Sequence, residues 1–89
     1  MHTLPQISRF RKRKEEGNEY LYFFSEDERM FFVNQETDFI ITQIKEEKDY
    51  NLIVNKIVKK YNISNMDANE MLESVIDRLT NLNITIKEE

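Results

Sequence analysis

Residues 30–44, MFFVNQETDFIITQI, decide the fold. Four apolar residues from Met30 to Val33 run into Asn34, and a second apolar stretch begins at Phe39. The first block is too short for a helix and too apolar for a loop, so it predicts a strand. Asn34 suits a helix cap, because its side-chain oxygen can accept an orphan backbone N–H. The stretch therefore predicts a strand that leads directly into a helix.

Two more strands are expected upstream. Residues 19–24, EYLYFF, place Tyr20, Tyr22 and Phe24 on one face and Leu21 and Phe23 on the other. Residues 7–12 show a weaker alternation. Gly17 signals a turn between these runs. A polar turn then joins the second strand to the third, so the three strands should form an antiparallel sheet.

Three helices are expected downstream, because apolar residues recur there at helical spacing. The first follows Asn34 and ends in the charged turn at residues 45–48. Asp49 is a plausible cap for the second helix. Ser64 is a plausible cap for the third helix, which should run to about Leu82.

The predicted fold class is α+β, a three-stranded antiparallel sheet followed by three helices, in a winged-helix-like layout. Ile84 and Ile86 should add a short extended tail. With 89 residues, the chain is expected to form one domain over residues 1–89, with an ordered core of about residues 6–86.

The composition favours a protein that is not an enzyme and needs no cofactor. The chain has no cysteine, one glycine and one histidine, which excludes a thiolate nucleophile, a cysteine-ligated metal and a glycine-rich phosphate loop. Most of the 17 carboxylates fall in turns or on polar helix faces, with no histidine to complete a metal site. Without a signal-peptide core or a membrane-spanning run, the expected location is the cytoplasm, away from membranes.

Charge is divided unevenly along the chain. Residues 1–14 carry +5, while the whole chain carries −4, so −9 falls on residues 15–89. The third expected helix has four acids and a single base, Arg78. A helix of that charge is a poor reader of DNA, because phosphate attraction supplies most non-specific affinity. We therefore expect no nucleic-acid partner and keep a winged-helix transcription regulator as the alternative function.

The third strand raises the question of what covers it. Phe31 and Val33 should point into the core. Met30 and Phe32 should face the other way, where they would rest on the aromatic residues of the second strand or cover a dimer contact. If the strand is an open edge, its unpaired N–H and C=O groups invite an extended peptide, the binding mode called β-augmentation.

Three stretches carry a resemblance to a known family: MFFVNQETDFIITQI, DYNLIVNKIVKKYN and MDANEMLESVIDRLTNLNI. Together they resemble the PqqD-like family, the RiPP recognition elements, which bind leader segments of ribosomally made precursor peptides. The resemblance covers about residues 20–84 and departs from the family pattern at residues 45–48, where Asp-Gly is common. The residues that carry it are Val33, Asn34, Ile40, Ile41, Ile44, Ile53, Tyr61, Val75, Leu79 and Leu82.

The resemblance implies that a leader peptide lies antiparallel to the third strand, in a groove between that strand and the third helix. One wall would be Met30, Phe31, Phe32 and Val33, and the other Met71, Ser74, Val75 and Arg78. Core packing is the alternative role of Met71 and Val75. Arg78 would pair with an acid of the leader or, alternatively, make a surface contact with Asp77 or Ser74.

The expected function is that of a stand-alone adaptor. It would capture the leader of a precursor peptide and present it to a separate modifying enzyme, such as a radical-SAM enzyme or a cyclising maturase. The expected assembly is a monomer or a weak homodimer. A structural homodimer in which two third strands pair is a further alternative.

Overall fold

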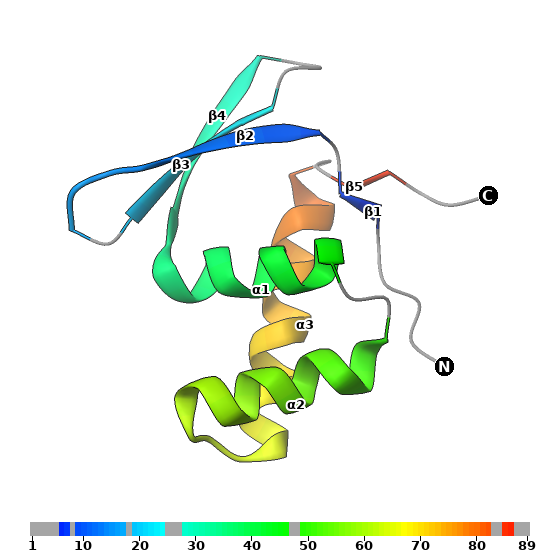
Figure 1. The fold of residues 1–89 in the computed structure, drawn as a ribbon. Coiled ribbons are helices and arrows are strands. Elements are labelled where there is room, and N and C mark those ends of the chain that lie inside the picture. The colour runs from blue at the N-terminus through cyan, green and yellow to red at the C-terminus, as the bar shows by residue number, and fades with distance from the viewer. Residues whose placement is uncertain are drawn as a thin grey trace.

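The computed structural model describes residues 6–7, 9–17, 19–24, 28–46, 49–82 and 85–86. Strands β2, β3 and β4 form an antiparallel sheet with β3 in the middle, and three helices follow it (Figure 1). The predicted α+β fold class is therefore confirmed. The elements are β1 (Gln6–Ile7), β2 (Phe10–Lys14), β3 (Glu19–Phe24), β4 (Arg29–Asn34), α1 (Gln35–Glu46), α2 (Tyr50–Tyr61), α3 (Asn65–Asn81) and β5 (Thr85–Ile86).

The first predicted strand, residues 7–12, is wrong in its bounds. The chain divides there into two strands: β2 pairs with β3, whereas β1 pairs with β5. Gln6 lies opposite Ile86 and Ile7 opposite Thr85, so the predicted C-terminal extension is a strand with a partner. Ile84 lies outside the described residues.

The helix starts are as predicted, because each cap residue satisfies a free backbone N–H. Asn34 Oδ1 accepts from the N–H of Thr37 at 2.7 Å. Asp49 and Ser64 accept in the same way from backbone groups two or three residues further on. Asn62 ends α2 in a left-handed conformation with φ 54°, which asparagine tolerates well.

The core lies between the inner face of the sheet and the helices. Helix α1 packs against β3 and β4, and α2 lies on the side of the helical layer away from the sheet (Figure 1). The buried apolar residues come from β3, β4 and all three helices: Tyr22, Phe24, Val33, Ile40, Ile41, Ile44, Tyr50, Ile53, Val54, Ile57, Ala68, Leu72, Val75 and Leu79.

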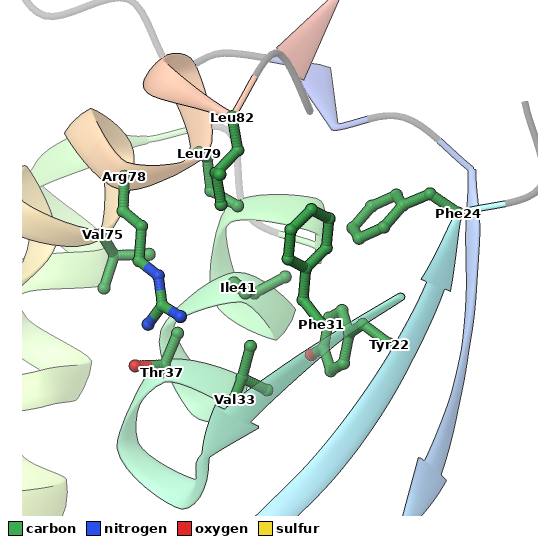
Figure 2. Close-up of a pocket in the computed structure, with 10 residues that line it drawn as sticks. All are labelled: Tyr22, Phe24, Phe31, Val33, Thr37, Ile41, Val75, Arg78, Leu79 and Leu82. Atoms are coloured by element: carbon green, nitrogen blue, oxygen red, sulfur yellow. The ribbon is translucent and has the colours of Figure 1, made fainter. Parts of the chain in front are cut away.

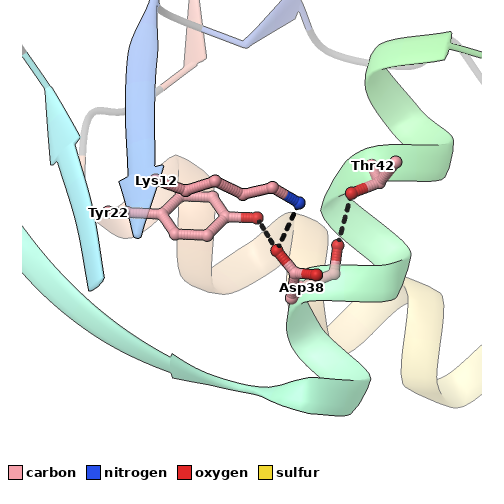
Figure 3. Close-up of polar contacts among 4 residues, drawn as sticks. All are labelled: Lys12, Tyr22, Asp38 and Thr42. Atoms are coloured by element: carbon pink, nitrogen blue, oxygen red, sulfur yellow. Dashed lines mark hydrogen bonds and ion pairs between the residues drawn. The ribbon is translucent and has the colours of Figure 1, made fainter. Parts of the chain in front are cut away.

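A buried polar contact fixes the sheet on α1 (Figure 3). The hydroxyl of Tyr22 donates to Asp38 Oδ1 at 2.5 Å, and Lys12 Nζ donates to the same oxygen at 3.0 Å. Tyr22 is fully buried and Asp38 is 8% exposed. Burial, reinforced by the hydrogen bond to Asp38, raises the pKa of Tyr22, so its hydroxyl remains a proton donor. This contact joins β2, β3 and α1.

Removing the carboxylate should therefore destabilise the fold. Asp38→Ala should lower the free energy of unfolding by about 1–3 kcal/mol, because it leaves the buried hydroxyl of Tyr22 without an acceptor. Glu36→Ala is the matched control, since it removes an exposed acid from the same first turn of α1. Urea unfolding at neutral pH measures both, and equal losses would contradict a special role for Asp38.

Tyr22 should also make stability fall at alkaline pH. The unfolded side chain has a pKa of about 10 and loses its proton above that pH, whereas the raised pKa keeps it in the folded protein. Stability should then decrease with rising pH by about 1.4 kcal/mol per unit for this group. Tyr22→Phe should be less stable at pH 8 but should lose less stability between pH 10 and pH 11. Parallel profiles in urea unfolding would refute this assignment.

Candidate peptide-binding groove

Strand β4 is an edge of the sheet. Within the described part of the chain it pairs with β3 and has no strand on its other side. A pocket opens beside it, between the inner face of the sheet and α3, with α1 below (Figure 2). The site therefore combines a free backbone edge with an adjacent groove.

The groove is lined almost entirely by apolar side chains. The groove opens to solvent, and the free space within it is small. About 20 Å³ is open to the centre of a water molecule, which is room for about one water. A peptide side chain would therefore enter by displacing the half-buried residues at the mouth. The lining residues are Tyr22, Phe24, Phe31, Val33, Thr37, Ile41, Val75, Arg78, Leu79 and Leu82.

Two sequence periodicities create this groove. Phe31 and Val33 point inward because alternate residues of a strand share a face. Residues 75, 78, 79 and 82 share one face of α3 and its end, at the i, i+3, i+4, i+7 spacing. Arg29 ties one end of the groove, since its Nη1 donates to the carbonyl oxygen of Leu82 and its guanidinium lies 5.4 Å from the ring of Phe31.

Arg78 is the charged residue of the groove. Its side chain is exposed and points across the mouth toward Thr37 and Val33 (Figure 2). Among the described residues it makes no ion pair, so the alternative contact with Asp77 is not formed. An acidic group that enters the groove would therefore meet a cation with no competing partner in this part of the chain.

A second, wider hollow with a mixed polar and apolar lining adjoins the groove and shares Thr37 and Val75 with it. Its cavity volume is about 440 Å³, and it lies between the first turns of α1 and the face of α3. Met71 and Ser74 line this hollow, together with three acids, Glu36, Asp67 and Glu70. The predicted helix wall is thus divided: Arg78 borders the apolar groove, Met71 and Ser74 border the hollow, and Val75 borders both.

The strand wall is divided as well. Phe31 and Val33 line the groove, but the side chains of Met30 and Phe32 project from the outer face of the sheet, where each is 61% exposed. Of the predicted strand wall, Phe31 and Val33 therefore line the groove, whereas Met30 and Phe32 lie on the opposite face, and contact of these two side chains with a peptide stays a prediction. They also do not rest on Tyr22, which lies on the inner face. A role for their backbone groups in peptide pairing stays a prediction.

Several groove residues were not foreseen. Tyr22 and Phe24 follow from the alternation of β3, which places them on the same inner face as Phe31. Ile41 and Leu79 belong to the helical pattern of apolar residues, and both are buried. The sequence pattern does not indicate which of these core residues remain accessible beside the β4 edge of the sheet.

Metal-binding clusters and membrane-spanning helices are both absent from the described residues. No group of three His, Cys, Asp or Glu side chains is placed there to hold a metal ion. No helix in these ranges is long and apolar enough to cross a membrane. What the groove offers is a strand edge, an apolar lining and the guanidinium of Arg78 at its mouth.

Comparisons with known proteins identify a structural neighbour. No family model matches the sequence, and no curated protein matches it. Among solved structures, the chain is similar to TbiB1, determined in complex with the TbiA(beta) leader peptide, with a TM-score of 0.76. The match covers 94% of this chain and 98% of that chain at 16% sequence identity, so what it establishes is a common fold.

Proposed function

We propose that this chain is a leader-peptide-binding adaptor. It captures the leader of a ribosomally made precursor peptide by β-augmentation on β4 and presents the precursor to a separate modifying enzyme. The observation that carries the proposal is the free edge of β4 beside an apolar groove. An edge of this kind supplies backbone hydrogen bonds, and the groove supplies side-chain specificity.

The structural neighbour supports this proposal. TbiB1 has the same fold over nearly its whole length and was determined with a leader peptide bound. The resemblance of the sequence to RiPP recognition elements points to the same class of ligand. In this chain, a peptide strand beside β4 would direct alternate side chains inward, toward Phe31, Val33 and Leu79.

Such an adaptor accelerates a reaction without performing chemistry. Holding the leader close to an enzyme raises the local concentration of the attached core peptide, to the millimolar range for short flexible linkers. The enzyme, of the radical-SAM or cyclising class for example, would carry out the modification, and the adaptor would need no cofactor of its own.

The alternative function, DNA binding by a winged helix, draws no support from α3. Its exposed face carries Asp67, Glu70 and Asp77. Placing these carboxylates near phosphates would oppose the attraction on which DNA affinity depends.

The proposal is tested with a synthetic peptide that covers the leader half of the short precursor-type peptide encoded nearest to this gene. Calorimetric titration should give saturable binding in the micromolar range or below. Peptides methylated at one backbone nitrogen at a time should then lose affinity with a period of two, by about tenfold where the N–H faces β4. Similar losses at successive positions would overturn β-augmentation, because a helical ligand uses nearly every backbone N–H in its own hydrogen bonds.

Arg78 should contribute to the affinity for a leader that carries an acid in the bound segment. Arg78→Glu should raise the Kd about three- to tenfold, because it replaces attraction by repulsion at the groove mouth. Lys59→Glu, an equal charge change on the exposed side of α2, should change the Kd less than twofold.

The Arg78 comparison requires that both variants remain folded. Since both side chains are exposed bases in the last turn of a helix, each substitution should lower the free energy of unfolding by a similar amount, about 1 kcal/mol or less. Equal losses of peptide affinity in the two variants would mean that only the net charge of the protein matters.

A further inference from the structure

The outer face of the sheet carries an apolar surface that the groove does not use. Phe32 lies opposite Leu21 and Met30 lies opposite Phe23 in the pairing of β4 with β3. All four side chains point away from the helices, because they alternate with the inward residues Tyr22 and Phe31. We call these four residues the outer patch.

Exposure within the outer patch is uneven, and the unevenness has a geometric cause. Leu21 and Phe23 are half-buried, whereas Met30 and Phe32 are each 61% exposed. The central strand has neighbours on both flanks, but β4 has a neighbour on one flank only among the described residues. What Met30 and Phe32 lack is the side chains of a further strand.

A peptide strand paired with β4 would supply those side chains. Its residues alternate between the two faces of the extended sheet, so every second side chain enters the groove and the others lie on the outer face. Directly opposed residues on neighbouring strands have Cβ atoms about 4.5–5.5 Å apart, which is contact distance. The outward row of the peptide would therefore lie against Met30 and Phe32.

We propose that Met30 and Phe32 are specificity-determining residues that select apolar side chains in the outward row of the bound peptide. This inference rests on the proposed function and extends it: the peptide is recognised on both faces of the sheet. It holds for a peptide of either direction, because parallel and antiparallel strands both alternate with a period of two.

The outer patch favours apolar side chains in the outward row of the peptide. Met30 and Phe32 offer no hydrogen-bonding group of their own, and their nearest neighbours on this face are Leu21 and Phe23. The cations of this face, Arg11 and Arg13, lie on β2, two strands away from the edge where the peptide would pair. Within the described part of the chain, a charged side chain opposite Met30 or Phe32 would therefore face apolar side chains on β4 and on β3 behind it.

The test works whatever the natural ligand is. A displayed library of random 12-residue peptides is selected against the wild-type chain, against Phe32→Glu and against Arg11→Glu. The last is the control, because it places a glutamate on the same face but two strands from the edge, with a change in net charge (−2) at least as large as that of Phe32→Glu (−1). Met30→Glu is a second variant, one outward position along β4 from Phe32.

The wild-type protein should enrich peptides with two interleaved apolar rows. Phe32→Glu should enrich peptides with Lys or Arg at one outward position and an unchanged inward row. In Met30→Glu that basic position should move by two residues. A peptide selected on the wild type should bind Phe32→Glu about two- to fivefold more weakly, the range expected for one cross-strand pair, and should bind Arg11→Glu unchanged.

Other outcomes overturn the inference in distinguishable ways. The selected peptides could alternate with a period of two and yet have the same residues at their outward positions in all variants. That result would support the proposed function but refute selection by Met30 and Phe32. If the wild type enriches no peptide, or peptides without alternation, the proposed function fails as well. A wild-type chain that sediments as a dimer and becomes a monomer in Phe32→Glu would assign the outer patch to a second copy of this chain.

Discussion

The hydrogen bond between Tyr22 and Asp38 is the contact on which the rest of the arrangement depends. Tyr22 belongs to the central strand, its ring stacks on Phe10 of β2 with centroids 4.6 Å apart, and its hydroxyl reaches α1. The same ring forms part of the groove wall. Tyr22 therefore holds the sheet against α1 and also lines the groove. The position of the groove wall depends on its hydrogen bond to Asp38.

Most of the fold could be predicted from local patterns. Each of the patterns that predict it spans only a few neighbouring residues. These patterns are the alternation in EYLYFF, the caps at Asn34, Asp49 and Ser64, and the helical spacing of apolar residues. The pairing of β1 with β5 could not be predicted, because it joins two-residue strands from opposite ends of the chain. No local sequence period indicates a contact of that kind. The bounds of the first predicted strand were wrong for the same reason, because β1 and β2 pair with different strands.

The site was predictable in part. Alternation correctly separates Phe31 and Val33 from Met30 and Phe32, yet the resemblance to a family of peptide binders led to all four being placed in one wall. A family pattern identifies the strand, whereas the face on which each side chain lies follows from the period of two. The division of the α3 wall at Val75 depends on how the helix crosses the sheet, which is a tertiary property absent from the sequence pattern.

The short ladder of β1 and β5 bears on how this fold could be joined to other proteins. Gln6 and Ile86 are paired, and paired Cα atoms of antiparallel strands lie about 4.5–5.5 Å apart. The first and last residues of the described chain therefore lie next to each other. A host protein could carry the whole fold as an insertion between two neighbouring residues, since chain ends that lie close together tolerate insertion and permutation well.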